Sequence, residues 1–124
     1  MAKARQDVFQ GLLAPQFDAL YALTDGWDSY SAPAPVADAI ACARELVDVL
    51  ARHGCAIAHI GPSVPGGVGI TVEQEATEFA IEFRNSGKAV LTVITADGEI
   101  AVHELKNDDT AQAEILSILA GDLG

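Results

Sequence analysis

Between residues 36 and 50, apolar side chains recur at steps of three and four residues, which places them on one side of an α-helix. We predict a helix over about residues 35–53. Asp38 suits its first turn and Arg52 its last, because acids favour helix N-termini and bases favour C-termini, and Gly54 follows as a stop. The side that faces the core is then formed by Val36, Ala39, Ile40, Ala43, Leu46, Val47 and Leu50.

The same helical spacing occurs near both ends of the chain. Residues 3–23 have a helical pattern that Gly11 and Pro15 interrupt, which predicts two short helices or one kinked helix. A last helix is predicted over about residues 109–120, with short polar residues before it that can cap its N-terminus.

After Gly54 the hydrophobic period changes from about 3.6 residues to about 2, the period of a β-strand. The pattern predicts four strands and a shorter, more mixed fifth. Asp97 and Gly98 form a strong hairpin signal. Because short connections make neighbouring strands antiparallel, the strands should form a meander. They are predicted over about residues 55–60, 68–75, 77–84, 88–95 and 99–105.

These elements together predict an α+β fold with two layers. An antiparallel β-meander of four to five strands packs on the long helix, with further helices toward the N-terminus and the C-terminus. No repeat or change of composition divides the chain, so we expect a single domain over residues 1–124.

The stretch over residues 26–35 leads into the long helix and contains the only tryptophan. Pro33 and Pro35 fix the backbone dihedral φ, so the stretch should be stiff. Trp27 and Tyr30 each combine a large apolar ring with one polar group, which favours a role in clamping this loop onto a helix and the sheet. The alternative is contact with a ligand or partner, because rigid aromatic rings in loops also form interaction hot spots.

Half of the residues are apolar, as in a folded domain, but the charges are unbalanced. The chain has 18 acidic and 7 basic residues, a formal net charge of −11. This charge disfavours direct binding to nucleic acid or to an anionic membrane, which both require positive charge near phosphate. It favours a basic protein partner, unless the acid serves only solubility. No stretch is apolar enough to span a bilayer and no signal peptide is visible, so we expect a cytoplasmic protein.

Candidate catalytic and metal-binding residues form no recognisable motif. Gly66 and Gly67 lack the Gly-Lys-Ser/Thr ending of a phosphate-binding loop. The histidines and cysteines are scattered over different predicted elements, without the spacing of metal ligands. We therefore expect no catalytic residue, no metal and no cofactor, and free thiols at both cysteines. These scattered residues are His53, His59, His103, Cys42 and Cys55.

Four glutamates and no basic residue lie between Thr71 and Phe83. On a hairpin of the second and third predicted strands, Glu73 and Glu82 should project from the face opposite the apolar side chains. Such a surface would suit docking of a protein rich in lysine and arginine, because complementary charge accelerates and selects association. The alternative is an ordinary solvated face. The four residues are Glu73, Glu75, Glu78 and Glu82.

Two short motifs flank the long predicted helix. They read W-D-S-Y-S-A-P over residues 27–33 and G-G-V-G-I-T-V-E over residues 66–73. With these motifs the chain resembles, over about residues 25–105, a set of small bacterial and phage-borne proteins that share a W-D/N-G/S-Y-x-A-x-P start, a helix and a meander. Glycine is more common than Ser29 in that set, and tryptophan more common than Val72. The resemblance implies the fold outline and a mobile-element or defence-related setting, and it implies no activity and no site residue.

We expect a non-enzymatic interaction module that inhibits or neutralises a basic nucleic-acid-handling protein, as antitoxins, immunity proteins and phage anti-defence inhibitors do. Its partner would be a nuclease or a subunit of a defence complex, bound by the four glutamates with Trp27 and Tyr30 as anchors. An assembly subunit of a homo-oligomer is the alternative, with apolar surfaces at residues 88–95 and 8–13. A small-ligand binder or enzyme is the third, and it would need a pocket where histidine and carboxylate side chains converge.

Overall fold

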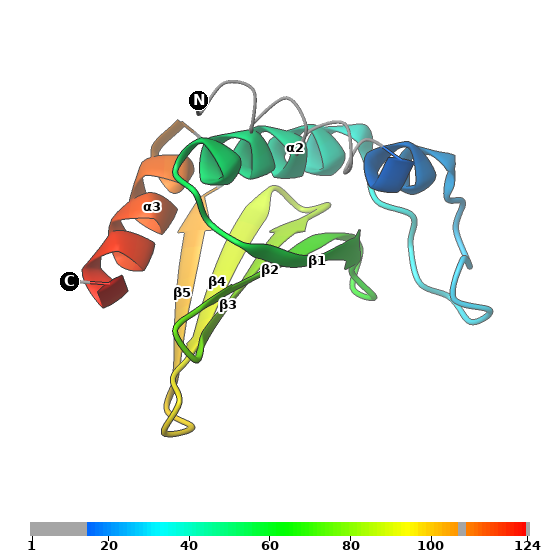
Figure 1. The fold of residues 1–124 in the computed structure, drawn as a ribbon. Coiled ribbons are helices and arrows are strands. Elements are labelled where there is room, and N and C mark those ends of the chain that lie inside the picture. The colour runs from blue at the N-terminus through cyan, green and yellow to red at the C-terminus, as the bar shows by residue number, and fades with distance from the viewer. Residues whose placement is uncertain (1–14, 107–108, 124) are drawn as a thin grey trace.

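A computed structural model describes residues 15–106 and 109–123, and its five strands form one sheet in the order β1-β2-β3-β4-β5 (Figure 1). Each strand pairs antiparallel with its neighbour in the chain, so the predicted α+β meander is confirmed. The elements are a helix over residues 15–22, α2 (Ala37–Arg52), β1 (Ile57–Pro62), β2 (Gly67–Gln74), β3 (Thr77–Arg84), β4 (Lys88–Ile94), β5 (Ile100–Lys106) and α3 (Asp109–Leu123).

The structure describes only part of the segment near the N-terminus that is predicted to be helical. Residues 15–22 are helical, and Phe17 and Leu20 of this helix are buried in the core. Residues 3–14 of the predicted segment, which include Gly11, lie outside the described residues.

Both α2 and α3 lie on the same side of the sheet (Figure 1). α2 contacts β1, β2 and β3, whereas α3 contacts β5. Ile115 and Leu119 of α3 belong to the same buried cluster as the apolar side of α2. No helix of the described chain covers the opposite face of the sheet, which we call the open face.

Side chains alternate between the two faces of each strand, and those on the face toward α2 form the core. In β3, Phe79 and Phe83 are fully buried whereas the residues between them on the other face are partly exposed. Truncating either ring to alanine would cost about 3–5 kcal/mol, because the cavity cannot collapse completely. The stripe predicted for α2 is buried except for Val36, which is 42% exposed because it precedes the first helical turn. The buried residues of α2 are Ala39, Ile40, Ala43, Leu46, Val47 and Leu50.

α2 stops at the predicted glycine. Gly54 has a φ of +75°, in the left-handed region that glycine adopts at helix ends. Its N–H donates to the Ala51 carbonyl at 3.1 Å, and the N–H of Cys55 donates to the Leu50 carbonyl at 3.0 Å. These bonds hold Cys55 against the end of the helix, so β1 begins at Ile57 and not at Cys55 as the pattern predicted.

β2 and β3 are joined by a two-residue turn, Glu75 and Ala76, between the paired residues Gln74 and Thr77. Both turn residues have positive φ, +47° and +71°, as a type I′ turn requires. Alanine is strained in this region because its Cβ approaches the backbone, whereas glycine is not. The turn therefore fixes the register of the hairpin at some cost in stability.

Replacing Ala76 by glycine should increase the free energy of unfolding by about 0.5–1 kcal/mol, because the left-handed backbone is no longer strained. Ala96→Gly is the matched control, since Ala96 lies in the β4–β5 turn without a positive φ and should gain nothing. Urea denaturation measures both changes. Equal effects at the two positions would contradict the turn geometry.

Candidate functional site

Two carboxylates lie side by side on the open face at one end of the sheet. Glu73 of β2 pairs directly with Glu78 of β3, Glu78 pairs with Ile94 of β4, and Ile94 pairs with Ile100 of β5. Paired residues of antiparallel strands project to the same face, with Cβ atoms about 4.5–5.5 Å apart. One row across the sheet therefore holds two glutamates and two isoleucines.

Further acidic residues lie in the turns at the same end, because the β2–β3 and β4–β5 connections of a meander emerge together. Glu75 is in the first turn, and Asp97 and Glu99 are in the second, all three exposed. In the part of the chain that the structure describes, no carboxylate of this group has an ion-pair partner. We call the group, Glu73, Glu75, Glu78, Asp97 and Glu99, the acidic end.

The basic residues of the sheet lie at the opposite end. Arg84 ends β3, Lys88 begins β4, and Lys88 pairs with Lys106 of β5. Glu78 and Arg84 are six residues apart on β3, which corresponds to roughly 20 Å at about 3.3 Å per residue. The separation is about twice the Debye length at physiological salt, so these bases compensate the acidic end only weakly.

Glu82 differs from the other three predicted glutamates because it is compensated. Its carboxylate accepts hydrogen bonds from Arg84 Nε, at 2.7 Å, and from the Ser63 hydroxyl. The bond to Glu82 raises the pKa of the Arg84 guanidinium above its usual value. Glu82 faces the open side as predicted, but it contributes little uncompensated charge.

A shallow hollow of about 340 Å³ lies in the middle of the open face, between the acidic end and Arg84. Its floor is formed by small residues of neighbouring strands, including Gly69, Thr71 and Ala80. Thr71 pairs with Ala80 across β2 and β3, so no large residue fills this position. The hollow gives the open face a concave centre.

Trp27 and Tyr30 lie far from the acidic end, in a loop held by its own hydrogen bonds. The Trp27 indole Nε1 donates to the Pro33 carbonyl at 3.0 Å, and Asp28 Oδ1 accepts from the N–H groups of Tyr30 and Ala32 at 3.0 and 3.1 Å. Tyr30 is 86% exposed, and Trp27 does not belong to the core. The indole therefore closes the loop, while the Tyr30 ring is free to contact a partner.

Asn85 fastens this loop to the basic end of the sheet. Its Oδ1 accepts from the Val36 N–H at 2.8 Å, and its Nδ2 donates to the Ala34 carbonyl at 2.9 Å. A Cβ at Gly66, where φ is +105°, would lie 2.8 Å from Asn85 Nδ2, so glycine is required there. The six predicted site residues thus separate into Glu73, Glu75 and Glu78 at one end, Glu82 in an ion pair, and Trp27 and Tyr30 beyond the other end.

Ser29, in the same loop, has a φ of +69°. Glycine adopts this left-handed conformation with less strain than serine.

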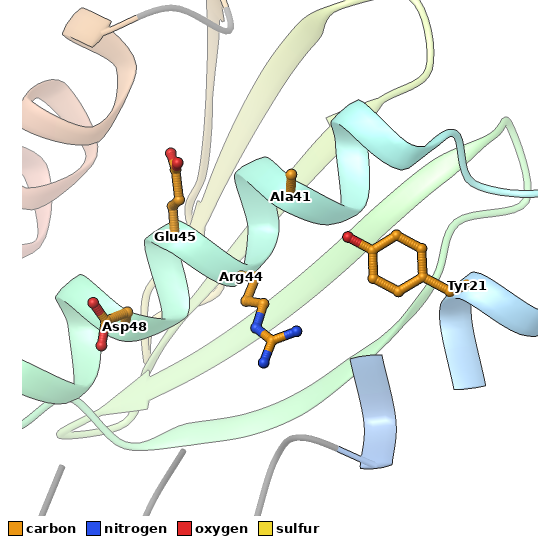
Figure 2. A pocket seen from close by; sticks show the side chains of 5 residues that line it. All are labelled: Tyr21, Ala41, Arg44, Glu45 and Asp48. Carbon is orange, nitrogen blue, oxygen red and sulfur yellow. The ribbon is translucent and has the colours of Figure 1, made fainter. Parts of the chain in front are cut away.

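Figure 2 shows a second hollow, of about 390 Å³, on the outer side of α2 beside Tyr21. Arg44 lies 5.7 Å from the centre of the Phe17 ring, where cation and ring attract each other. Glu45 accepts from the Gln112 side chain at 3.5 Å, and Asp48 pairs with Arg52 at 3.3 Å. Because each charged side chain of its described lining is engaged locally, this hollow has the chemistry of an ordinary helix surface.

Among the described residues, no group of three or more His, Cys, Asp or Glu side chains could hold a metal ion. His59 and His103 lie on the two edge strands, so they cannot converge. The described helices include none that is long and apolar enough to cross a membrane.

Comparison of the chain with protein-family models, with curated protein sequences and with solved structures finds no significant match in any of the three.

Sequence reasoning missed Asp97, Glu99 and the exposed pair Ile100 and Val102 as members of the candidate surface. The signal was available, because a two-residue turn at 75–76 and an Asp-Gly turn after β4 place both connections at one end of a meander.

Asn85→Ala should lower the free energy of unfolding by about 1–3 kcal/mol, because it removes two hydrogen bonds that each contribute about 0.5–1.5 kcal/mol. Tyr30→Ala, in the loop that Asn85 holds, should change it by less than about 0.5 kcal/mol, because the ring is exposed. Urea denaturation compares the two. A larger loss for Tyr30→Ala would show that its ring packs on the protein.

Proposed function

We propose that this protein is a non-enzymatic interaction module that binds a basic protein surface through the acidic end of its open sheet face. The single observation that carries the proposal is the direct pairing of Glu73 with Glu78, which have no ion-pair partner among the described residues, on the face that also exposes Ile100 and Val102. The proposed surface includes the acidic patch predicted from the sequence and also the residues of β4 and β5 in the same row.

The Glu73–Glu78 pair is costly for the isolated protein. Like charges directly opposite each other on neighbouring strands destabilise a sheet by about 0.2–1 kcal/mol. A lysine or arginine of a partner placed between the two carboxylates would turn this repulsion into two attractive contacts. The cost is therefore recovered on binding.

Apolar side chains next to the carboxylates supply the other part of an interface. Ile100 and Val102 are 66% and 61% exposed. Ile94 lies between Ile100 and Glu78 in the row, so apolar and acidic groups are contiguous. Interfaces combine a desolvated apolar centre with charges that orient the partner and accelerate association. The hollow at the centre of the open face provides space for a side chain of the partner.

The chemistry of this surface indicates the class of partner. A net charge of −11 disfavours phosphate-containing ligands and favours proteins rich in lysine and arginine. Nucleic-acid-handling proteins, such as nucleases or subunits of defence complexes, expose such surfaces for contact with phosphate. A module that covers this surface would inhibit its partner by competing with nucleic acid, as an antitoxin, an immunity protein or an anti-defence inhibitor does.

Glu78→Lys should affect stability and binding in opposite directions. The free energy of unfolding should rise by about 0.3–1 kcal/mol, because an attractive pair with Glu73 replaces a repulsive one. The affinity for the basic partner should fall at least about tenfold, because the loss of a charge contact worth about 1.4 kcal/mol changes the dissociation constant by that factor. Urea denaturation and calorimetric titration of the partner purified from the native host measure the two quantities.

Glu114→Lys is the control, because it makes the same change in net charge on the exposed surface of α3, away from the sheet. It should leave both quantities nearly unchanged. The double variant Glu73→Lys/Glu78→Lys restores repulsion, so it should lose the gain in stability and bind even less. Equal affinity of wild type and Glu78→Lys, or an affinity that is the same at about 0.05 and 0.5 M salt, would refute an electrostatic interface here.

Self-association through β5 is the second candidate function, corresponding to an assembly subunit. β5 is an edge strand of seven residues, and it has neither proline nor a register shift. The other edge strand, β1, contains Pro62 and a register shift between Ile57 and His59, which hinder addition of a further strand. An unprotected edge with exposed apolar side chains favours pairing with a second copy.

If β5 mediates self-association, light scattering at high protein concentration should give the mass of a dimer for the wild type and of a monomer for Val102→Lys. Val64→Lys is the control, since Val64 is similarly exposed but lies in the β1–β2 loop. A wild-type monomer at all concentrations would exclude this candidate.

A further inference from the structure

A pocket of about 630 Å³ opens where α2 ends, between the last residue of β2 and α3. Leu116, Leu119 and Cys55 form its apolar floor, and Gln74 of β2 contributes one amide. Ala113 and Ser117, one helical turn apart on α3, lie at its mouth. This pocket lies on the helical side of the sheet, so it is separate from the open face.

The size and lining of the pocket match those of small-molecule sites, which occupy about 300–1,000 Å³ and combine apolar walls with a few polar groups. Its described lining contains no Asp, Glu, Lys or Arg. Burial raises the pKa of the Cys55 thiol, so this group is neutral at physiological pH. The convergence of histidine and carboxylate groups that an enzyme site would need does not occur among these residues.

The Gln74 side chain supplies a second observation that points to a ligand. Within the described chain, Gln74 Nε2 is the one buried side-chain nitrogen or oxygen without a hydrogen-bond partner. Leaving a buried donor unpaired costs about 1–3 kcal/mol. Nε2 has an accessible area below 1 Å², so the Gln74 side chain must turn toward the pocket before an acceptor atom there removes this cost.

The surroundings select a neutral ligand. The carbonyl end of α2 lies at the pocket, since His53 and Gly54 belong to its lining, and the negative end of a helix dipole repels anions. The net charge of −11 adds to this repulsion of anions. A cation would be attracted, but the largely apolar described lining offers no carboxylate to replace its water shell, and burying an unpaired charge is costly. We infer that this pocket binds a small, neutral, largely apolar molecule that presents a carbonyl or similar acceptor to Gln74 Nε2.

The solvatochromic ketone Prodan, a neutral aromatic molecule with one carbonyl acceptor, is a suitable probe. Its fluorescence should shift to the blue and saturate as the protein is titrated, with a dissociation constant in the micromolar range. Ser117→Trp, which fills the mouth of the pocket, should weaken binding at least tenfold. Gln74→Met, which keeps the length of the side chain but removes the donor, should weaken it about three- to tenfold.

Glu114→Trp is the control for Ser117→Trp, because residue 114 is exposed on the same helix but does not line the pocket. It should bind Prodan like the wild type. Prodan should also slow alkylation of Cys55, which lines the pocket, and leave alkylation of Cys42, which does not, unchanged. Circular dichroism of each variant verifies that it is folded.

Absence of saturable binding by the wild type, or equal binding by Ser117→Trp and the wild type, would overturn the assignment of this pocket as the binding site. Unchanged affinity of Gln74→Met would overturn the role of Gln74 and with it the inferred class of ligand. Neither result affects the acidic interface, whose residues lie on the other face of the sheet.

Discussion

The burial of one face of the sheet beneath α2 determines where every other side chain of the sheet lies. Phe79, Ile81 and Phe83 of β3 belong to the same buried cluster as Leu46 and Leu50 of α2. Because side chains alternate along a strand, burying these residues directs their neighbours to the open face. A register slip of one residue would place glutamates in the core, so the hydrophobic packing also fixes the positions of the charges.

Two surfaces of different chemistry follow from this one-sided core. The open face has no described helix over it, so it presents charge and apolar side chains together at one end. The helical side leaves a gap where α2 stops beside α3, because Gly54 turns the chain away there, and Leu116 and Leu119 line this gap. The first surface suits a charged macromolecule, and the second suits a small neutral molecule.

The sequence predicted the fold well and the candidate site only in part, for physical reasons. The hydrophobic period of a segment shows which face of that element is buried, and it depends only on residues close together in the chain. The elements, and the face of the sheet from which Glu73 and Glu82 project, could therefore be predicted from the sequence. The role of Trp27 depends on its hydrogen bond to the Pro33 carbonyl within the loop. The position of that loop depends on Asn85, about fifty residues away in the chain. Such long-range contacts leave no periodic signal in the sequence. Compensation of Glu82 was accessible, because Glu82 and Arg84 are two residues apart on one strand and must share a face.

The contrast between Glu82 and the acidic end bears on the choice between the proposed interface and acid that serves only solubility. Two carboxylates of the described chain are compensated by a base at short range on the same element, Glu82 by Arg84 and Asp48 by Arg52. Around Glu73 and Glu78 the described structure offers no such base, although the two residues are directly paired and like charges repel in that arrangement. Solubility requires charge at the surface but not two like charges on one pair of strands beside exposed isoleucine and valine. An interface with a basic partner requires both.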